Sequence, residues 1–129
     1  MKLRLTAIGL LIISVLGLAT IASADGVTKR VKFARGKSSA TISGAVVRGD
    51  RDTYTVGAKA GQMMSVKITS TEDNAVFQVM DADGEYLQDA GDGDDAKSWT
   101  GDLPSTGDYK IIVGGTRGNA SYKLTVSIK

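Results

Sequence analysis

The side chains that most often perform catalysis are largely missing from this sequence. It contains no histidine and no cysteine, so it cannot form a Ser-His-Asp or a Cys-His nucleophile. Zinc sites built from the same two residue types are excluded as well. The carboxylates that remain cluster in turns of a small chain, where the deep cleft and raised pKa values of a glycosidase are hard to build. We therefore expect a protein that binds rather than catalyses, and that needs no cofactor.

An acidic, glycine-rich segment in the middle of the chain invites a calcium interpretation. The segment DADGEYLQDAGDGDD contains Asp81, Asp83, Asp92 and Asp94, and carboxylate oxygens are the ligands that Ca²⁺ prefers. Their spacing does not match an EF-hand loop. The favoured interpretation is a β-hairpin with an Asp-Gly turn, followed by a solvated acidic loop. A calcium site on these four residues is kept as the alternative.

Hydroxyl groups are concentrated in one turn near the C-terminal end, LPSTGDYKIIV at residues 103–113. Pro104 fixes its own φ angle and pushes Leu103 towards extended geometry. Gly107 permits a tight reversal of the chain. These residues predict a turn of defined shape directly before a strand.

The same turn raises a question of function. Tyr109 is in phase with Ile111 and Val113, so we expect its ring to point into the core with its hydroxyl at the rim. Ser105 and Thr106 then either complete an ordinary turn or form a binding tip, because functional residues often lie on loops held by a rigid scaffold. The residues alone favour the ordinary turn.

Alternating apolar and polar residues indicate that β-strands position these turns. In the last segment, SYKLTVSIK, every second residue is apolar, which places one set in a core and the other in water. The same period of two occurs in RVKFAR, ATISGAVV, DTYTVGA and MMSVKIT, whereas AVFQVMD and DYKIIV are more apolar on both faces, as central strands are. Turns rich in Gly and Asp separate the segments, and the single tryptophan, Trp99, is expected in or at the edge of the core. The pattern predicts an all-β protein, an antiparallel β-sandwich of about seven to nine strands with jelly-roll character.

The N-terminal segment, residues 1–24, has the layout of a secretory signal peptide. Lys2 and Arg4 precede an apolar stretch that ends in Ala-Ser-Ala, and small residues at these positions are typical of a cleavage site. We expect cleavage before Asp25, a periplasmic or secreted location, and one domain at residues 25–129. Retention of the apolar stretch as a membrane anchor is the alternative, because about 20 apolar residues can span a bilayer.

The expected mature chain is neutral, but its charges are segregated along the sequence. Residues 25–67 contain nine basic and three acidic residues. Residues 68–108 contain one basic and eleven acidic residues, and residues 109–129 contain four basic residues and no acidic one. A neutral total argues against a nucleic-acid partner, which requires a basic surface. Segregated charge is compatible with an oriented protein partner, unless strands from the three blocks interleave and average the charge.

Several motifs resemble the bacterial periplasmic lysozyme inhibitors, above all those acting on goose-type lysozyme and their invertebrate-type relatives. The motifs are F-x-x-G-x-S-S-A, S-G, D-T-Y-T, A-K-x-G-Q, L-P-x-x-G-x-Y and a T-R before the last strand. They extend over nearly the whole of residues 25–129, with the weakest match at about 74–99. The resemblance implies a rigid β-sandwich that blocks a lysozyme active site without turnover.

The resemblance also implies which residues touch the partner. In this family a loop carrying Ser-Gly-x-Tyr is thought to enter the lysozyme cleft and to form hydrogen bonds near the catalytic acid. Gly107 and Tyr109 match that motif, and its Ser position is Thr106, which keeps the hydroxyl but adds a methyl group. The implied inhibitory loop therefore contains Ser105, Thr106, Gly107 and Tyr109. Arg117, expected on a neighbouring loop, is a further candidate that could pair with a cleft carboxylate.

A second resemblance supports a different function. DTYTVGAKAGQ, DADGEYL and LPSTGDYKIIV are similar to the pre-peptidase C-terminal β-sandwich module, an accessory domain of secreted peptidases in which Gly-x-Tyr is a structural turn. This resemblance implies a non-catalytic module that contacts glycan or protein in the cell envelope. Neither resemblance implies a nucleic acid or, after signal cleavage, a membrane as partner, and a homodimer is left open.

Overall fold

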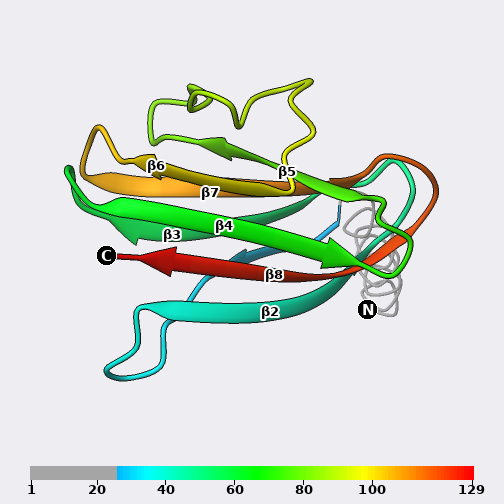
Figure 1. The fold of residues 1–129 in the computed structure, drawn as a ribbon, viewed down its shortest axis with the longest axis horizontal. Coiled ribbons are helices and arrows are strands. Elements are labelled where there is room, and N and C mark those ends of the chain that lie inside the picture. Colours follow the sequence, from blue (N-terminus) through cyan, green and yellow to red (C-terminus); the bar gives the residue numbers. More distant parts are fainter. Residues whose placement is uncertain (1–25) are drawn as a thin grey trace, which may run out of the picture.

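A computed structural model describes residues 26–129 of the protein. The expected signal peptide at residues 1–24 and its cleavage site before Asp25 lie outside the described residues. The described chain consists of eight strands, and no helix within it is long and apolar enough to cross a membrane. The strands form two four-stranded sheets that pack face to face (Figure 1). The prediction of an all-β sandwich is confirmed.

The two sheets combine strands that are distant in the sequence. The order in the first sheet is β1 (Thr28–Arg30), β3 (Asp52–Ala58), β7 (Gly107–Gly115) and β5 (Ala75–Met80). The order in the second sheet is β2 (Ser39–Val46), β8 (Ala120–Ile128), β4 (Met63–Ser70) and β6 (Ser98–Asp102). All pairings are antiparallel except that between β1 and β3. One edge of each sheet is therefore formed by β1 or β2, and the other by β5 or β6.

The alternating pattern of the sequence identifies the core correctly. In β8 the apolar residues Tyr122, Leu124, Val126 and Ile128 are buried against the opposite sheet, as the period of two predicts. The segment RVKFAR differs from its prediction, because the strand ends at Arg30 and Val31 enters the core from a loop.

Strand β6 carried no alternating signal in the sequence. Its one large apolar side chain, Trp99, is 9% exposed, and its indole nitrogen donates a hydrogen bond to the carbonyl of Gln88 at 2.9 Å. A single apolar residue shows no periodicity, so only the pairing with β4 defines this strand. The expectation that Trp99 lies in or at the edge of the core is confirmed.

A chain of buried hydrogen bonds connects the two sheets through the core. The Tyr122 hydroxyl on β8 donates to Oδ2 of Asp52 at 2.6 Å, and the Tyr54 hydroxyl on β3 lies 2.6 Å from the Tyr122 oxygen. Oδ1 of Asp52 accepts from the main-chain nitrogen of Val27 at 3.0 Å, just before β1. A Cβ at Gly44 would lie 2.5 Å from the Tyr122 hydroxyl oxygen, so the glycine makes room for this ring. The polar groups of the core are thereby paired, as burial requires.

The two core tyrosines should make the fold sensitive to alkaline pH. Burial raises the pKa of Tyr122 above its ordinary value, hydrogen bonds to Asp52 and Tyr54 raise it further, and burial also raises the pKa of Tyr54. Above about pH 10 the unfolded chain loses these phenolic protons while the folded chain keeps them. The free energy of unfolding should then fall with rising pH by at most about 1.4 kcal/mol per pH unit for each such tyrosine, and below about pH 10 the contribution is fully present.

Urea denaturation at a series of alkaline pH values measures this dependence. The Tyr122→Phe variant removes one titrating group, so its stability should fall less steeply with pH than that of the native protein. Equal slopes for the two proteins would show that Tyr122 does not keep its proton in the folded state.

Candidate functional site

The turn at residues 103–106 is anchored at one end of the sandwich. This end carries the β3–β4 and β6–β7 connections, on the left in Figure 1. Leu103 is 2% exposed, its nitrogen donates to the Gln62 carbonyl at 2.8 Å, and its carbonyl accepts from the Gly61 nitrogen at 2.9 Å. Residues 103–106 and the adjoining β3–β4 turn at residues 59–62 are called the tip below.

Tyr109 has an internal role that differs from the expected one. Its side chain is completely buried, and its hydroxyl donates to the Ser105 carbonyl at 2.6 Å while accepting from the Ser105 nitrogen at 3.1 Å. The hydroxyl is therefore not presented to solvent at the rim of the sandwich. It closes the turn from inside and fixes the backbone of Ser105.

Thr106 is the exposed hydroxyl of the tip. Its Oγ1 accepts a hydrogen bond from the Ala60 nitrogen at 2.9 Å, which orients the side chain and leaves its own hydrogen available to an outside acceptor. Ser105 is half-buried beside it, with Oγ 3.4 Å from the Tyr109 hydroxyl. The sequence-predicted residues Ser105, Thr106, Gly107 and Tyr109 thus form one structural unit.

The outer face of the first sheet carries an ion pair that the sequence did not predict, and one of its residues, Asp108, lies just after the tip in the chain. Arg30 on β1 binds Asp108 on β7 through two hydrogen bonds of 2.7 and 3.2 Å. These hydrogen bonds raise the pKa of Arg30 and lower that of Asp108. Gly57 on the intervening strand β3 has no side chain to block the approach. No sequence signal connects two residues that are 78 positions apart.

Arg117 lies at the opposite end of the sandwich from the tip. It follows β7, whereas the tip precedes β7, and a strand of this length separates the two by about 30 Å. Its guanidinium donates to the Glu72 carbonyl at 2.6 Å. The expectation that Arg117 lies on a loop neighbouring the tip is wrong. The turns before and after one strand lie at opposite ends of the sandwich, and β7 runs between the tip and Arg117.

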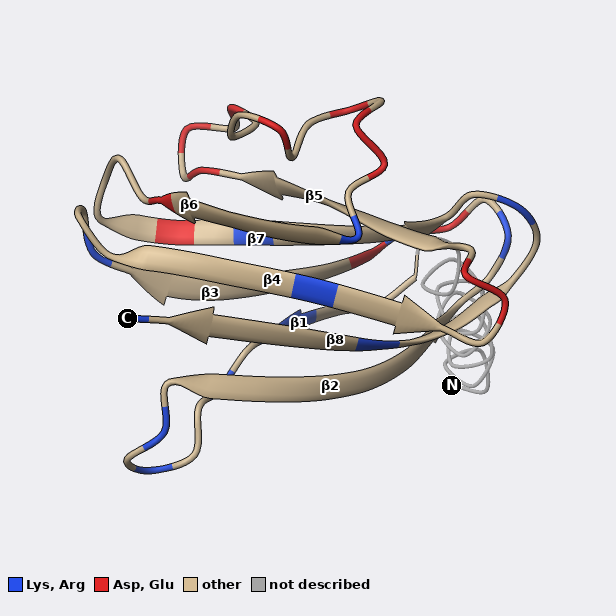
Figure 2. Ribbon diagram, in the orientation of Figure 1, with Lys and Arg blue, Asp and Glu red and all other residues tan. Residues whose placement is uncertain are grey.

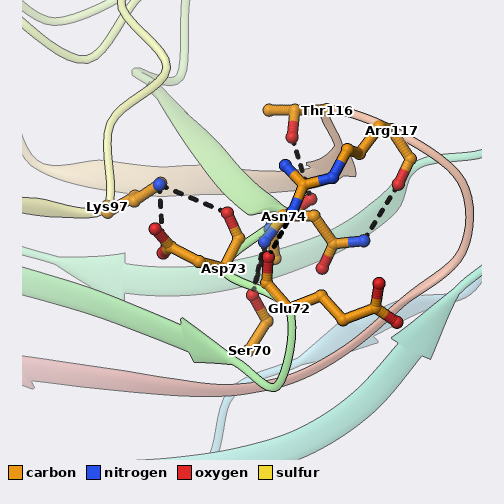
Figure 3. Close-up of polar contacts among 8 residues, drawn as sticks. Ser70, Glu72, Asp73, Asn74, Lys97, Thr116 and Arg117 are labelled. Carbon is orange, nitrogen blue, oxygen red and sulfur yellow. Dashed lines mark hydrogen bonds and ion pairs between the residues drawn. The ribbon is translucent and has the colours of Figure 1, made fainter.

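A buried asparagine holds the loop that carries Arg117 (Figure 3). Asn74 is 2% exposed, and its side-chain nitrogen donates to the carbonyls of Arg117 and Asn119 at 2.9 and 3.0 Å. The main-chain carbonyl of Asn74 accepts a hydrogen bond from the Thr116 nitrogen at 2.8 Å. This end of the molecule is therefore also a hydrogen-bonded structure, separate from the tip.

The acidic segment begins with the expected turn. Oδ1 of Asp81 accepts from the nitrogens of Asp83 and Glu85 at 2.9 and 3.0 Å. The returning arm makes only a single bridge, Met80 to Tyr86, rather than a full strand. The hairpin interpretation therefore holds for the turn and not for a paired second strand.

The other candidate calcium ligands are used locally. Asp92 accepts from the Gln78 side chain at 3.1 Å, and Asp94 accepts from the Gly91 nitrogen at 2.8 Å. Within residues 26–129, no group of three or more acidic side chains is close enough to hold a metal ion. The arrangement of these carboxylates gives the calcium alternative no support.

The charge blocks of the sequence become two opposite edges of the molecule. The acidic residues of the loop at 81–95 lie along the edge formed by β5, whereas the cations at 32–37 lie on the projecting β1–β2 loop at the other edge (Figure 2). These two loops keep their charges apart in space, because the strand order places β1 and β5 at opposite edges of the first sheet.

Comparison with known proteins identifies structural relatives. No family model matches the chain, and no curated protein matches its sequence. The crystal structure of Aeromonas hydrophila PliG, a periplasmic lysozyme inhibitor of g-type lysozyme, superposes with a TM-score of 0.69 and 37% identity, covering 82% of this chain and all of that one. Salmonella Typhimurium PliG gives a TM-score of 0.62 at 28% identity, with 81% and 99% covered.

A more distant relative shares only the fold. The pre-peptidase C-terminal domain of collagenase from Bacillus anthracis has 18% identity and a TM-score of 0.57, with 83% and 99% covered. The Aeromonas protein, in contrast, matches over its whole length at 37% identity. With that identity and the same sandwich, the chain belongs to the family of PliG periplasmic inhibitors of g-type lysozyme.

Proposed function

We propose that this protein inhibits lysozyme in the periplasm, that g-type lysozyme is its preferred target, and that the tip enters the active-site cleft. Family membership supports inhibition, since the related structures are those of inhibitors rather than enzymes. The observation that best supports this contact is that the Tyr109 hydroxyl forms hydrogen bonds with both the carbonyl and the nitrogen of Ser105. A loop fixed in this way loses little conformational entropy when it binds.

The exposed Thr106 hydroxyl supplies the chemistry of the contact. Its oxygen is occupied by the Ala60 nitrogen, so the hydroxyl approaches a partner as a donor. The acceptor that suits it best is a carboxylate in the lysozyme cleft, because hydrogen bonds to a charged acceptor are shorter and stronger than neutral ones. The half-buried Ser105 offers a second hydroxyl at the base of the same loop.

The acidic loop can orient the approach. Ala82 in this loop lies 3.1 Å from where a Cβ of Gly107 would be, so the acidic segment begins beside the tip. A negative surface beside the contact accelerates the association of a basic partner and weakens with ionic strength. Arg117, about 30 Å away along β7, lies outside a cleft that the tip occupies, and it remains a candidate only for a contact at the other end.

Substitution of Thr106 tests the proposed contact. Thr106→Ala removes one hydrogen bond to a charged acceptor, worth about 1.5–3 kcal/mol, so the inhibition constant should rise by about 10- to 100-fold. The melting temperature should change little because the side chain is exposed. Thr106→Ser, which keeps the hydroxyl, should inhibit nearly as well as the native protein.

Clearing of a cell-wall suspension by goose-type, invertebrate-type and chicken-type lysozymes provides the measurement. Arg117→Ala is the matched surface control at the other end and should leave inhibition unchanged. The reverse result, a loss with Arg117→Ala and none with Thr106→Ala, would move the contact to that end. Inhibition of only the invertebrate-type enzyme would refute the g-type preference.

A non-catalytic envelope-binding module is the second candidate. It is favoured by the internal bonding of Tyr109, because a tyrosine that only closes a turn is what the pre-peptidase resemblance implies. If none of the three lysozymes is inhibited at micromolar protein, this candidate replaces the first.

A further inference from the structure

Within residues 26–129, strand β2 is a long sheet edge with no partner strand on its outer side. It spans eight residues, Ser39–Val46, and pairs only with β8 among the described strands. The other edges are short or covered: β1 has three residues and β6 five, and β5 is bonded on its outer side by the segment at 86–96. In the lower part of Figure 1, β2 borders the second sheet alone.

The free hydrogen-bonding groups of β2 can be assigned from its register. The Ile128 nitrogen donates to the Ser38 carbonyl, and residues 39 and 127 are the next pair of the antiparallel ladder. Hydrogen-bonded and non-bonded pairs alternate along such a ladder, so the even-numbered residues of β2 bond to β8. The nitrogens and carbonyls that point away from β8 belong to Ser39, Thr41, Ser43 and Ala45, whose side chains are all exposed.

Strand β2 lacks the features that normally protect an edge. Proteins block open edges with charged side chains, prolines, bulges or short strands. The sequence SATISGAV has no charged residue and no proline, and its pairing with β8 runs one to one from Ser39 to Val46 without a bulge. Its outward side chains are small or hydroxyl-bearing, so they do not hinder an approaching strand.

The charges around β2 indicate what would pair with it. Residues 26–49 contain no acidic residue; Lys32, Arg35 and Lys37 precede the strand and Arg48 follows it. All four are exposed, and within the described residues none of them is in an ion pair. Antiparallel pairing with β2 of a second copy would bring Lys37 beside Arg48 of that copy, which like-charge repulsion disfavours.

We propose that β2 binds an extended segment of a protein partner as an added strand of the second sheet, and that this segment carries acidic residues at both ends. Main-chain hydrogen bonds to Ser39, Thr41, Ser43 and Ala45 supply the affinity, as in other cases of β-strand addition. The cations at the two ends select the charge of the segment. This surface consists of other residues than the tip, so it provides a second contact.

A synthetic peptide tests the proposal directly. The probe is an acetylated and amidated peptide of alternating Thr and Val with Asp-Glu at each end, titrated into isotope-labelled protein. Binding should slow amide hydrogen exchange at Thr41, Ser43 and Ala45, which face outward. It should leave Ile42 and Gly44 unchanged, because their amides already bond to β8.

Two matched pairs separate strand addition from other binding. Ser43→Pro removes an outward nitrogen without disturbing the β8 ladder and should weaken binding by at least about tenfold, whereas Ser43→Ala should stay within about twofold. With the native protein, a peptide N-methylated at alternate residues should also bind at least about tenfold more weakly, so the test does not depend on the variant's folding.

A peptide with lysine ends tests the selection by charge. It should bind more weakly than the acidic peptide at low salt, and added salt should reduce the difference.

Any of three results would overturn the proposal. The first is the absence of saturable binding at millimolar peptide. The second is equal binding by Ser43→Pro, or by the N-methylated peptide, which would exclude main-chain pairing. The third is a concentration-dependent dimer in sedimentation equilibrium that Ser43→Pro abolishes, which would assign the edge to a second copy of the chain.

Discussion

Replacement of Tyr109 by alanine should lower the free energy of unfolding by about 3–5 kcal/mol and abolish lysozyme inhibition. The side chain is completely buried, so its removal leaves a cavity in the core between the two sheets. It also removes the hydroxyl that binds the carbonyl and the nitrogen of Ser105. This loss is a large share of the total stability of a small domain, which is about 5–15 kcal/mol.

The Tyr109→Phe variant separates stability from positioning. Phenylalanine fills the same space, so the free energy of unfolding should fall by only about 1–2 kcal/mol for the lost hydrogen bonds. The 103–106 turn, however, is no longer held from inside, and inhibition should weaken by about tenfold while most of the protein stays folded. Urea denaturation and the lysozyme clearing assay give the two quantities. A Tyr109→Phe protein that inhibits as well as the native one would show that this bond does not position the contact.

The second large effect is expected from Asp52. Asp52→Ala should lower the free energy of unfolding by about 3 kcal/mol, since it leaves buried polar groups without a partner. The Tyr122 hydroxyl loses its acceptor and the Val27 nitrogen loses its bond. Both groups lie at the point where the N-terminal strand β1 joins β3, so the loss should extend to this strand.

The isosteric Asp52→Asn variant is the matched control. Its amide keeps one acceptor and adds a donor, and a tyrosine hydroxyl can reverse its own direction to accommodate that donor. The free energy of unfolding should therefore fall by only about 1 kcal/mol. Urea denaturation compares the two variants, and hydrogen exchange at Thr53, whose nitrogen bonds to the Val27 carbonyl, reports on the attachment of β1. An Asp52→Ala protein as stable as the native one would show that the carboxylate is not needed for this network, and equal losses in the two variants would show that the amide does not replace it.

The tip and the β2 edge assign two kinds of contact to one rigid scaffold. At the tip, a tyrosine inside the core fixes a turn whose exposed threonine accepts a hydrogen bond from the Ala60 nitrogen and keeps its own hydroxyl hydrogen available to a partner. At the β2 edge, the outward main-chain groups have no partner among residues 26–129, and the charged residues that flank the strand at 32–48 are all positive. The two surfaces depend on different atoms, so variants of Thr106 and of Ser43 can be tested independently.

The sequence by itself determined the elements and their faces. Strands β2, β3, β4, β5, β7 and β8 coincide with runs of alternating or apolar residues, because successive side chains of a strand point to opposite sides. The glycine-rich and acidic turns were likewise expected from the backbone angles that they require. The turn at residues 103–106 could be named in advance because its residues are contiguous in the chain, whereas its contact with the turn at residues 59–62 could not.

Only the tertiary structure decided which elements meet. The short strands β1 and β6 are defined by their pairing with β3 and β4, and no local pattern predicts such a pairing. The Arg30–Asp108 pair and the Asp52–Tyr122 bond join residues more than 60 positions apart. The internal role of Tyr109 and the distance of Arg117 from the tip follow from the path of β7. Local periodicity depends on the geometry of a single strand, whereas neighbours across sheets depend on strand order, which arises only when the whole chain packs.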